Sequence, residues 1–251
     1  MSVLKTRYIS QISEVIHRPS KQENPKLFIL SCEGPVTEEI YFKDIISNLF
    51  KNISSKIQII SARDVFYSTN PTERTQADFD EQNRSSPRQV LDRLNNYINN
   101  NTIIDKDNNP DDEYWLVLDI DDHTNDQKKQ EWDAVLNEAK ENGYDYAISN
   151  PFFELWLLLH HDMVNDDDYK YAVTETHKYE KTNHFRNRLK KASLKNQKEP
   201  ELNHYSKECI KSAVSRAKSL HDIELSWPQN LGSTVYILVE KIVELDEQYC
   251  S

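Results

Sequence analysis

A short apolar segment that runs directly into two carboxylates constrains this chain more than any other feature. Residues 113–119 are mostly apolar, and Asp119 and Asp121 stand at their end with a spacing of two. Side chains two apart on a strand share a face, and like charges held that close repel unless a cation lies between them. The segment therefore predicts a strand whose end can seat a hard divalent ion such as Mg²⁺. A solvated, aspartate-rich turn is the alternative reading.

A second apolar segment repeats this arrangement. Residues 27–32 run into Glu33 and then Gly34, one of only three glycines in the chain. Glycine would allow a sharp turn and a close approach of a ligand to the backbone. Ligands of open α/β sheets bind beyond the carboxyl ends of the strands. If the two strands are neighbours in a parallel sheet, Glu33 and both aspartates converge at one edge.

Strand-like and helix-like segments alternate along the first 150 residues. The strand pattern covers 25–32, 56–62, 113–119 and 144–149, and the helical pattern covers about 37–50, 87–98 and 126–142. This alternation predicts an α/β fold with a parallel sheet flanked by helices. Beyond residue 150 we expect helices alone, near 151–161, 182–193, 204–221 and 230–248. The predicted organisation is a tail (1–24), an α/β domain (25–160) and a C-terminal helical extension packed on it (161–251).

Composition limits the classes of protein to which the chain can belong. Charged residues make up 29%, the mean hydropathy is −0.80, and no apolar run approaches the ~20 residues of a membrane helix. The three cysteines, Cys32, Cys209 and Cys250, lie too far apart for a zinc motif, and their odd number argues against a disulfide framework. We therefore expect a cytoplasmic protein without a membrane anchor. The net charge of −11 excludes a general nucleic-acid coat but leaves local basic patches open.

Glu154 is the one charged residue in the apolar segment 147–159. Asn150 and Pro151 are typical of the N-cap and first turn of a helix, and the segment is apolar nearly all round, so it should be buried. A buried carboxylate requires a metal, an Arg or Lys partner, or a proton. A glutamate that faces solvent or pairs with a structural Arg is the alternative to a role at the site. His160 and His161, directly after, indicate the helix end more than a ligand pair.

The segment 177–198 carries eight Lys or Arg residues and a single acid. Tyr179, His184 and Phe185 are interleaved with the cations and could stack on bases. The alternative is a solvated amphipathic helix, the more common outcome for a charged run. The candidate nucleic-acid-binding residues are Lys178, Lys181, Arg186, Arg188, Lys190 and Lys191.

Four blocks of the sequence together resemble the RloB family. They are Cys32–Lys43, Leu118–His123, Ser149–His160 and Asn230–Val235. The order of the acids, a glutamate after the first strand and Asp-x-Asp after a later one, is similar to the Toprim arrangement on a Rossmannoid sheet. The resemblance implies a Toprim-type, Mg²⁺- or Mn²⁺-dependent nuclease that hydrolyses phosphodiester bonds.

Carried over by position, the resemblance assigns roles to individual residues. Glu33 would be the general acid/base or a metal carboxylate, and Asp119 and Asp121 would bind the ion. Glu38 and Glu154 would be further acidic members, although Glu38 lies one residue farther from Glu33 than in the related OLD-type nucleases. Lys181 would contact a phosphate or the leaving group.

The resemblance also implies a setting. It indicates bacterial anti-phage defence by abortive infection, with a toxin-like nuclease under the control of an ABC-type or AAA-type ATPase. The target, RNA such as tRNA or DNA, stays open, as does the formation of a homo-oligomer. The competing hypothesis is a non-catalytic acidic scaffold that docks on the ATPase, which the net charge of −11 favours.

Overall fold

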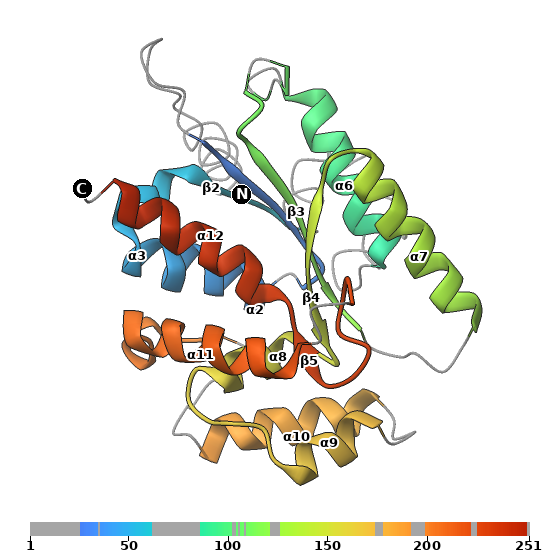
Figure 1. The fold of residues 1–251 in the computed structure, drawn as a ribbon, viewed down its shortest axis with the longest axis vertical. Coiled ribbons are helices and arrows are strands. Elements are labelled where there is room, and N and C mark those ends of the chain that lie inside the picture. The colour runs from blue at the N-terminus through green and yellow to red at the C-terminus, as the bar shows by residue number, and fades with distance from the viewer. Residues whose placement is uncertain are drawn as a thin grey trace, which may run out of the picture.

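The computed structural model describes residues 26–34, 36–61, 86–101, 104, 106–107, 109–120, 126–173, 178–191, 199–221 and 225–249 of the 251-residue chain. Within these ranges, five strands form one sheet in the order β2-β1-β3-β4-β5. Their bounds are β1 (Phe28–Cys32), β2 (Ile57–Ile60), β3 (Glu113–Asp119), β4 (Asp145–Asn150) and β5 (Gly232–Ser233). The first four run parallel, and β5 pairs antiparallel with β4. The α/β class and the parallel sheet flanked by helices are thus confirmed (Figure 1).

Helices connect the strands and continue after the sheet. In chain order they are α2 (Thr37–Ile40), the π-helical turn η1 (Tyr41–Ile46), α3 (Ser47–Leu49), the 3₁₀ turn η2 (Lys51–Lys56), α6 (Pro87–Asn100), α7 (Asp126–Glu141), α8 (Phe153–Leu159), α9 (Asp166–Val173), α10 (Lys178–Lys191), the 3₁₀ turn η3 (Leu202–His204), α11 (Lys207–Leu220) and α12 (Val235–Gln248). None of the helices in the described ranges is long and apolar enough to cross a membrane.

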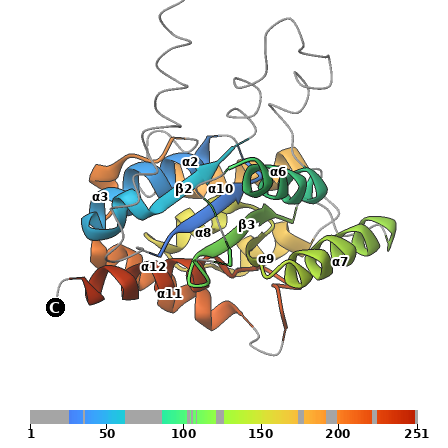
Figure 2. The same cartoon turned by 90° about the horizontal axis from the view of Figure 1, so that it is seen from above.

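The sheet is buried on both faces, which is why its strands are continuous apolar runs. Phe28 and Leu30 of β1 face a core formed with η1, α8, α11 and α12. Ile29, between them, faces a second core formed with α6 and α7. Figure 2 shows the sheet in the middle of this three-layer arrangement. Because successive side chains of a strand point into opposite cores, packing on both faces fixes the register of the strands. The positions of the strand ends are fixed with it.

The C-terminal segment contributes to the sheet, contrary to the expectation of helices alone after residue 150. Ser233 of β5 pairs with Ser149, and the amide of Thr234 donates to the carbonyl of Ile148 at 2.8 Å. The side-chain oxygen of Thr234 accepts in return from the amide of Ile148 at 2.9 Å. A two-residue strand has no apolar periodicity, so the sequence pattern could not reveal it. Helix α12 follows directly and buries Val239 in the core that contains β1.

The segment after β4 also differs from its prediction. Asn150 is the last residue of β4 rather than a helix N-cap, and α8 begins at Phe153 with Phe152 at the N-cap. The amide side chain of Asn150 is engaged elsewhere, because its Nδ2 donates to the carbonyl of Pro228 at 3.1 Å. All seven residues of α8 are buried, as the apolar pattern predicted. Helices α8, α9 and α10 lie toward the carboxyl end of the sheet (Figure 1).

A candidate metal centre at the carboxyl edge of the sheet

Glu33 and Asp119 meet where β1 and β3 end. The amide of Glu33 donates to the carbonyl of Val117 at 2.9 Å, which extends the β1–β3 ladder one residue beyond the strand. The Glu33 carboxylate then turns back, and its Oε2 accepts from the amide of Asp119 at 3.0 Å. Two acids that are 86 positions apart in the chain thus lie side by side at one edge of the sheet.

Glu38 lies near the same strand end, because its carboxylate packs directly against the backbone of Gly34. Glu38 lies in the first turn of α2 and is only 4% exposed. A Cβ atom added to Gly34 would lie 2.0 Å from Oε2 of Glu38, so the carboxylate rests directly on the glycine backbone. This contact explains why a chain with so few glycines has one here. The turn expected at Gly34 therefore also makes room for an acidic side chain.

The thiol of Cys32, the last residue of β1, responds to the charges around it. Burial is the main reason that its pKa lies well above the usual range, and the negative charge of Glu38 raises this pKa further. The positive charge of Arg93 acts in the opposite direction. Cys32 is therefore an unreactive, protonated thiol at the site, and it lies within electrostatic range of both an acid and a guanidinium.

Arg93 is the member of this edge that sequence reasoning missed. It projects from α6, is 9% exposed, and its Nη2 donates to the carbonyl of Cys32 at 2.7 Å. A signal was available in the sequence, because Arg93 stands three residues after Val90 and next to Leu94 on the apolar face of its helix. A cation on such a face must be buried with a partner.

The donor atoms at this edge suit a hard divalent cation. Glu33, Asp119 and Glu38 supply carboxylate oxygens, the ligand type that Mg²⁺ and Mn²⁺ prefer. Asp121 lies outside the described residues, so its place relative to Glu33 stays a prediction. Among the residues that the structure does describe, no three acidic, His or Cys side chains form a group that could hold a metal ion. The described residues thus supply carboxylate oxygens at this edge but do not by themselves form a metal site, and a metal ion remains a proposal.

Glu154 has a cationic partner, one of the alternatives that its burial required. Its Oε1 accepts from Nε and Nη2 of Arg186 at 2.9 and 2.8 Å. The Glu154 side chain is 8% exposed and that of Arg186 is 29% exposed. The pair joins α8 to α10, so Glu154 has a structural partner whether or not it also serves a metal.

Several residues of the basic segment are engaged in the fold of α10. Arg188 bonds both the fully buried Asp168 of α9 and Asp162. His184 also bonds Asp168, at 2.6 Å, and its ring stacks on that of Tyr171 with 4.1 Å between centroids. The expectation that Phe185 could stack on bases is wrong, because the ring is fully buried in the core.

The remaining cations of α10 fall into two groups. Lys190 and Lys191 are exposed at the end of the helix, and their contact with nucleic acid stays a prediction. The side chains of Lys178 and Lys181, and that of Tyr179, lie outside the described ones, so their roles stay predictions. Arg186 and Arg188 already neutralise acids of the same chain, so the surface they offer to nucleic acid is less cationic than the sequence suggested.

A buried cluster of aromatic and histidine side chains lies at the end of α8. The His160 ring is fully enclosed: Nδ1 bonds the carbonyl of Trp156 at 2.9 Å, and Nε2 bonds the hydroxyl of Tyr41 at 3.0 Å. Since a carbonyl only accepts, Nδ1 carries the proton and Nε2 accepts from Tyr41. Burial, chiefly, lowers the pKa of His160 to about 3, so the ring is neutral at physiological pH.

Comparison with known protein families adds an independent finding. Residues 28–242 match the family described as RloB-like protein, which covers β1 through most of α12. Neither the curated proteins nor the solved structures contain a match to this chain. The matched region includes Glu33, Asp119 and Arg93. On the extent of this match, the chain belongs to the RloB-like family.

Proposed function

We propose that this RloB-like protein is a Mg²⁺- or Mn²⁺-dependent endonuclease that hydrolyses phosphodiester bonds of RNA, such as tRNA, or of DNA. The observation that carries the proposal is the contact of the Glu33 carboxylate with the amide of Asp119 across the ends of adjacent parallel strands. That edge is where ligands bind in open α/β sheets. Family membership supports the proposal but does not specify the reaction.

Different side chains would bind the ion, accept a proton and guide the substrate. Glu33, Asp119 and Asp121 would hold the divalent ion, with Glu38 close to the same strand end. When bound, the ion would lower the pKa of a water molecule and stabilise negative charge on the phosphate oxygens. The Asp119 amide orients the Glu33 carboxylate, which would accept the proton of the attacking water. Lys190, Lys191 and, by position, Lys181 would guide the phosphate backbone.

The proposal includes the biological setting that the family resemblance implied. The nuclease would act in the cytoplasm in bacterial anti-phage defence, where an ABC-type or AAA-type ATPase would restrain it until infection. Nuclease activity held in this way would spare the host until the partner releases it. Co-purification of the chain with an ATPase encoded beside it would support this part of the proposal.

A second candidate is a non-catalytic acidic subunit that docks on the ATPase. The ion pairs of Arg186 and Arg188 favour it, because they reduce the cationic surface available to nucleic acid in a chain with a net charge of −11. A scaffold of this kind would neither bind Mn²⁺ at the carboxyl edge nor cleave nucleic acid. Its variants at Glu33 would dock normally.

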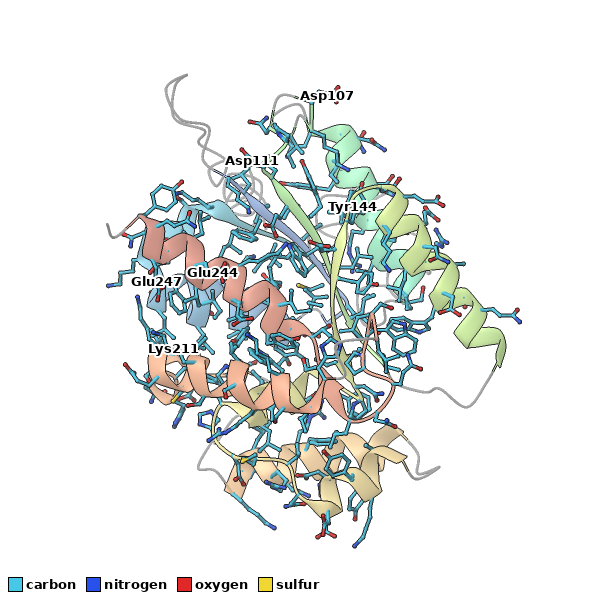
Figure 3. The ribbon with its side chains drawn as sticks, in the orientation of Figure 1. Asp107, Asp111, Tyr144, Lys211, Glu244 and Glu247 are labelled. Atoms are coloured by element: carbon cyan, nitrogen blue, oxygen red, sulfur yellow. The ribbon has the colours of Figure 1, made fainter. Side chains whose placement is uncertain are left out.

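The test is a cleavage assay with purified protein and Mn²⁺ on separate pools of tRNA, single-stranded DNA and plasmid. Asp119→Asn and Glu33→Gln should reduce cleavage of the sensitive pool by a factor of at least ~10². Asp111→Asn is the matched control: Asp111 is exposed and precedes β3 at the opposite end of that strand (Figure 3). Full activity of the two site variants, or no cleavage of any pool by the ATPase-free and ATPase-bound protein, would reject the nuclease.

A further inference from the structure

Tyr171 presents an aromatic ring at the surface of α9. The residue is 38% exposed, and its ring lies flat against that of His184 of α10, with 4.1 Å between the centroids and 19° between the planes. The His184 side chain is only 14% exposed. Most of the accessible surface of the stacked pair therefore belongs to Tyr171, and the stacking on bases expected of His184 is better suited to the tyrosine ring.

The buried Asp168 holds this stack in place. Its Oδ1 accepts from Nε2 of His184 at 2.6 Å, and its Oδ2 accepts from Nη1 of Arg188. Asp168 and Tyr171 are three positions apart on α9, so they lie on one side of that helix. The carboxylate thus fixes the His184 ring, which in turn fixes the plane of the Tyr171 ring. A ring that is already ordered loses little conformational entropy when a ligand stacks on it.

The stack lies on the side of the molecule at which the strands end. Helix α10 packs on α8, the helix that follows β4, and Arg186 of α10 bonds Glu154 of α8. Figure 1 shows α9 and α10 together beyond the carboxyl end of the sheet. The substrate of the proposed nuclease would lie at that same end. Tyr171 is therefore on the side of the molecule that the nucleic acid would occupy.

The charges around Tyr171 favour contact with a base over contact with a phosphate. Lys170, its neighbour in the chain, pairs with Asp167 at 3.1 Å, and Arg188 pairs with Asp168. A phosphate would meet little excess positive charge from these side chains, whereas an aromatic ring can stack on the face of any base. A base offers that face only where it is unpaired, as in a single strand, a loop or an end.

We infer that Tyr171 is a stacking platform for an unpaired base, and that the chain prefers single-stranded segments or loops of nucleic acid to continuous duplex. The inference rests on the proposed function for the class of ligand, and it deepens that function by naming the form of the substrate. The platform belongs to the binding surface and requires no metal ion. Because stacking does not neutralise phosphates, its contribution should persist at high salt.

Two full-length variants at Tyr171 and one control test the platform. Tyr171→Leu removes the aromatic ring, whereas Tyr171→Phe keeps it. Tyr169→Leu is the matched control, because Tyr169 is 41% exposed on the same helix but, two positions away, projects in a different direction. The probes are fluorescent oligouridylate and oligothymidylate and the duplex of each with its complementary strand. Fluorescence anisotropy at low and at high salt measures the affinities, in EDTA to prevent metal-dependent cleavage.

We expect the wild type to bind the single strands more tightly than the duplexes. Tyr171→Leu should weaken single-strand binding on the order of tenfold at both salt concentrations and leave duplex binding unchanged. Tyr171→Phe and Tyr169→Leu should bind as the wild type does. The inference would be overturned by unchanged single-strand affinity of Tyr171→Leu, by an equal loss for duplexes, or by an equal loss in Tyr171→Phe or Tyr169→Leu.

Cleavage assays with Mn²⁺ on the same preparations separate this inference from the proposed function. A wild type that cleaves nucleic acid but binds single strands independently of Tyr171, or does not bind them in EDTA, would keep the nuclease and overturn the platform. A wild type that binds single strands through Tyr171 but cleaves no substrate would reject the nuclease and support the platform.

Discussion

At the scale of single residues, His160 gives the fold a predictable sensitivity to acid. In the folded chain its pKa is lowered to about 3, mainly by burial, whereas in an unfolded chain the pKa of the ring is near its ordinary value of 6.5. Its contribution to stability is therefore complete above pH 6.5 and is lost as the pH falls toward 3. In that window the unfolded chain binds a proton that the folded chain excludes.

We expect His160→Gln to flatten this dependence. Between pH 6 and pH 4, the free energy of unfolding of the wild type should fall by about 1.4 kcal/mol per pH unit more than that of the variant. Urea unfolding at several pH values measures the difference. His161, whose pKa is also lowered by burial, remains in both proteins and cancels in the comparison. If the free energies of unfolding of the wild type and the variant fell in parallel with pH, His160 would not be held neutral in the folded chain, and the prediction would be wrong.

Gly34 provides a second test at this scale. Gly34→Ala should destabilise the fold by about 1–2 kcal/mol, because the new Cβ would overlap the carboxylate of Glu38, which is only 4% exposed and would have to shift within the packed interior. In a Glu38→Ala background the same change should cost less than about 0.5 kcal/mol. Gly143→Ala is the control: Gly143 has φ +71° and no neighbour within 4 Å, so its cost is independent of Glu38. Equal costs of Gly34→Ala in both backgrounds would contradict the contact.

The carboxyl edge of the sheet shows what residue patterns could and could not predict. The placement of Glu33 and Asp119 at one edge was predictable, because each follows an apolar run and parallel strands end at one edge. The contact of Arg186 with Glu154 and that of Arg93 with the Cys32 carbonyl could not be predicted. Each joins segments that only the packing of α10 or α6 brings together. Burial of Glu154 indicated that a partner was needed without indicating which one.

At the scale of elements, the pair of Glu154 and Arg186 fastens α10 to α8. Arg186→Met should cost about 3–5 kcal/mol, because it leaves a carboxylate that is 8% exposed without its cation. Glu154→Gln should cost less, about 1 kcal/mol, because Arg186 is 29% exposed and can turn to water. Urea unfolding measures both, with exposed Lys190→Met as the control. A larger loss from Glu154→Gln than from Arg186→Met would contradict this assignment.

Helices and strands with a long sequence pattern were predicted, whereas the shortest strand was not. The strand expected at 113–119 agrees with β3 residue for residue, and the helix expected at about 126–142 agrees with α7 (Asp126–Glu141). β5 was missed because two residues, Gly232 and Ser233, carry no periodicity. Its position depends on Thr234 and on pairing with β4, which are tertiary contacts.

At the scale of the whole molecule, the C-terminal segment is part of the fold that supports the site. A chain ending at Asn230 would lack β5 and α12 and so the buried residues Val235, Leu238, Val239 and Ile242. Their loss removes roughly 6–12 kcal/mol of apolar burial, comparable with the entire stability of a typical domain. We expect this chain to lose cooperative thermal unfolding by circular dichroism, whereas a chain ending at Tyr249 should retain it. A sharp transition in the shorter chain would show an independent N-terminal domain.

The central claim, that distant acids meet around a divalent cation at the carboxyl edge of the sheet, is tested most directly by anomalous diffraction from crystals of the full-length protein soaked in Mn²⁺. We predict one anomalous peak within coordination distance, about 2.1 Å, of carboxylate oxygens of Glu33 and Asp119. The peak should be absent from Asp119→Asn crystals and present in Asp111→Asn crystals. A Mn²⁺ peak elsewhere only, or none at saturating Mn²⁺, would contradict the account.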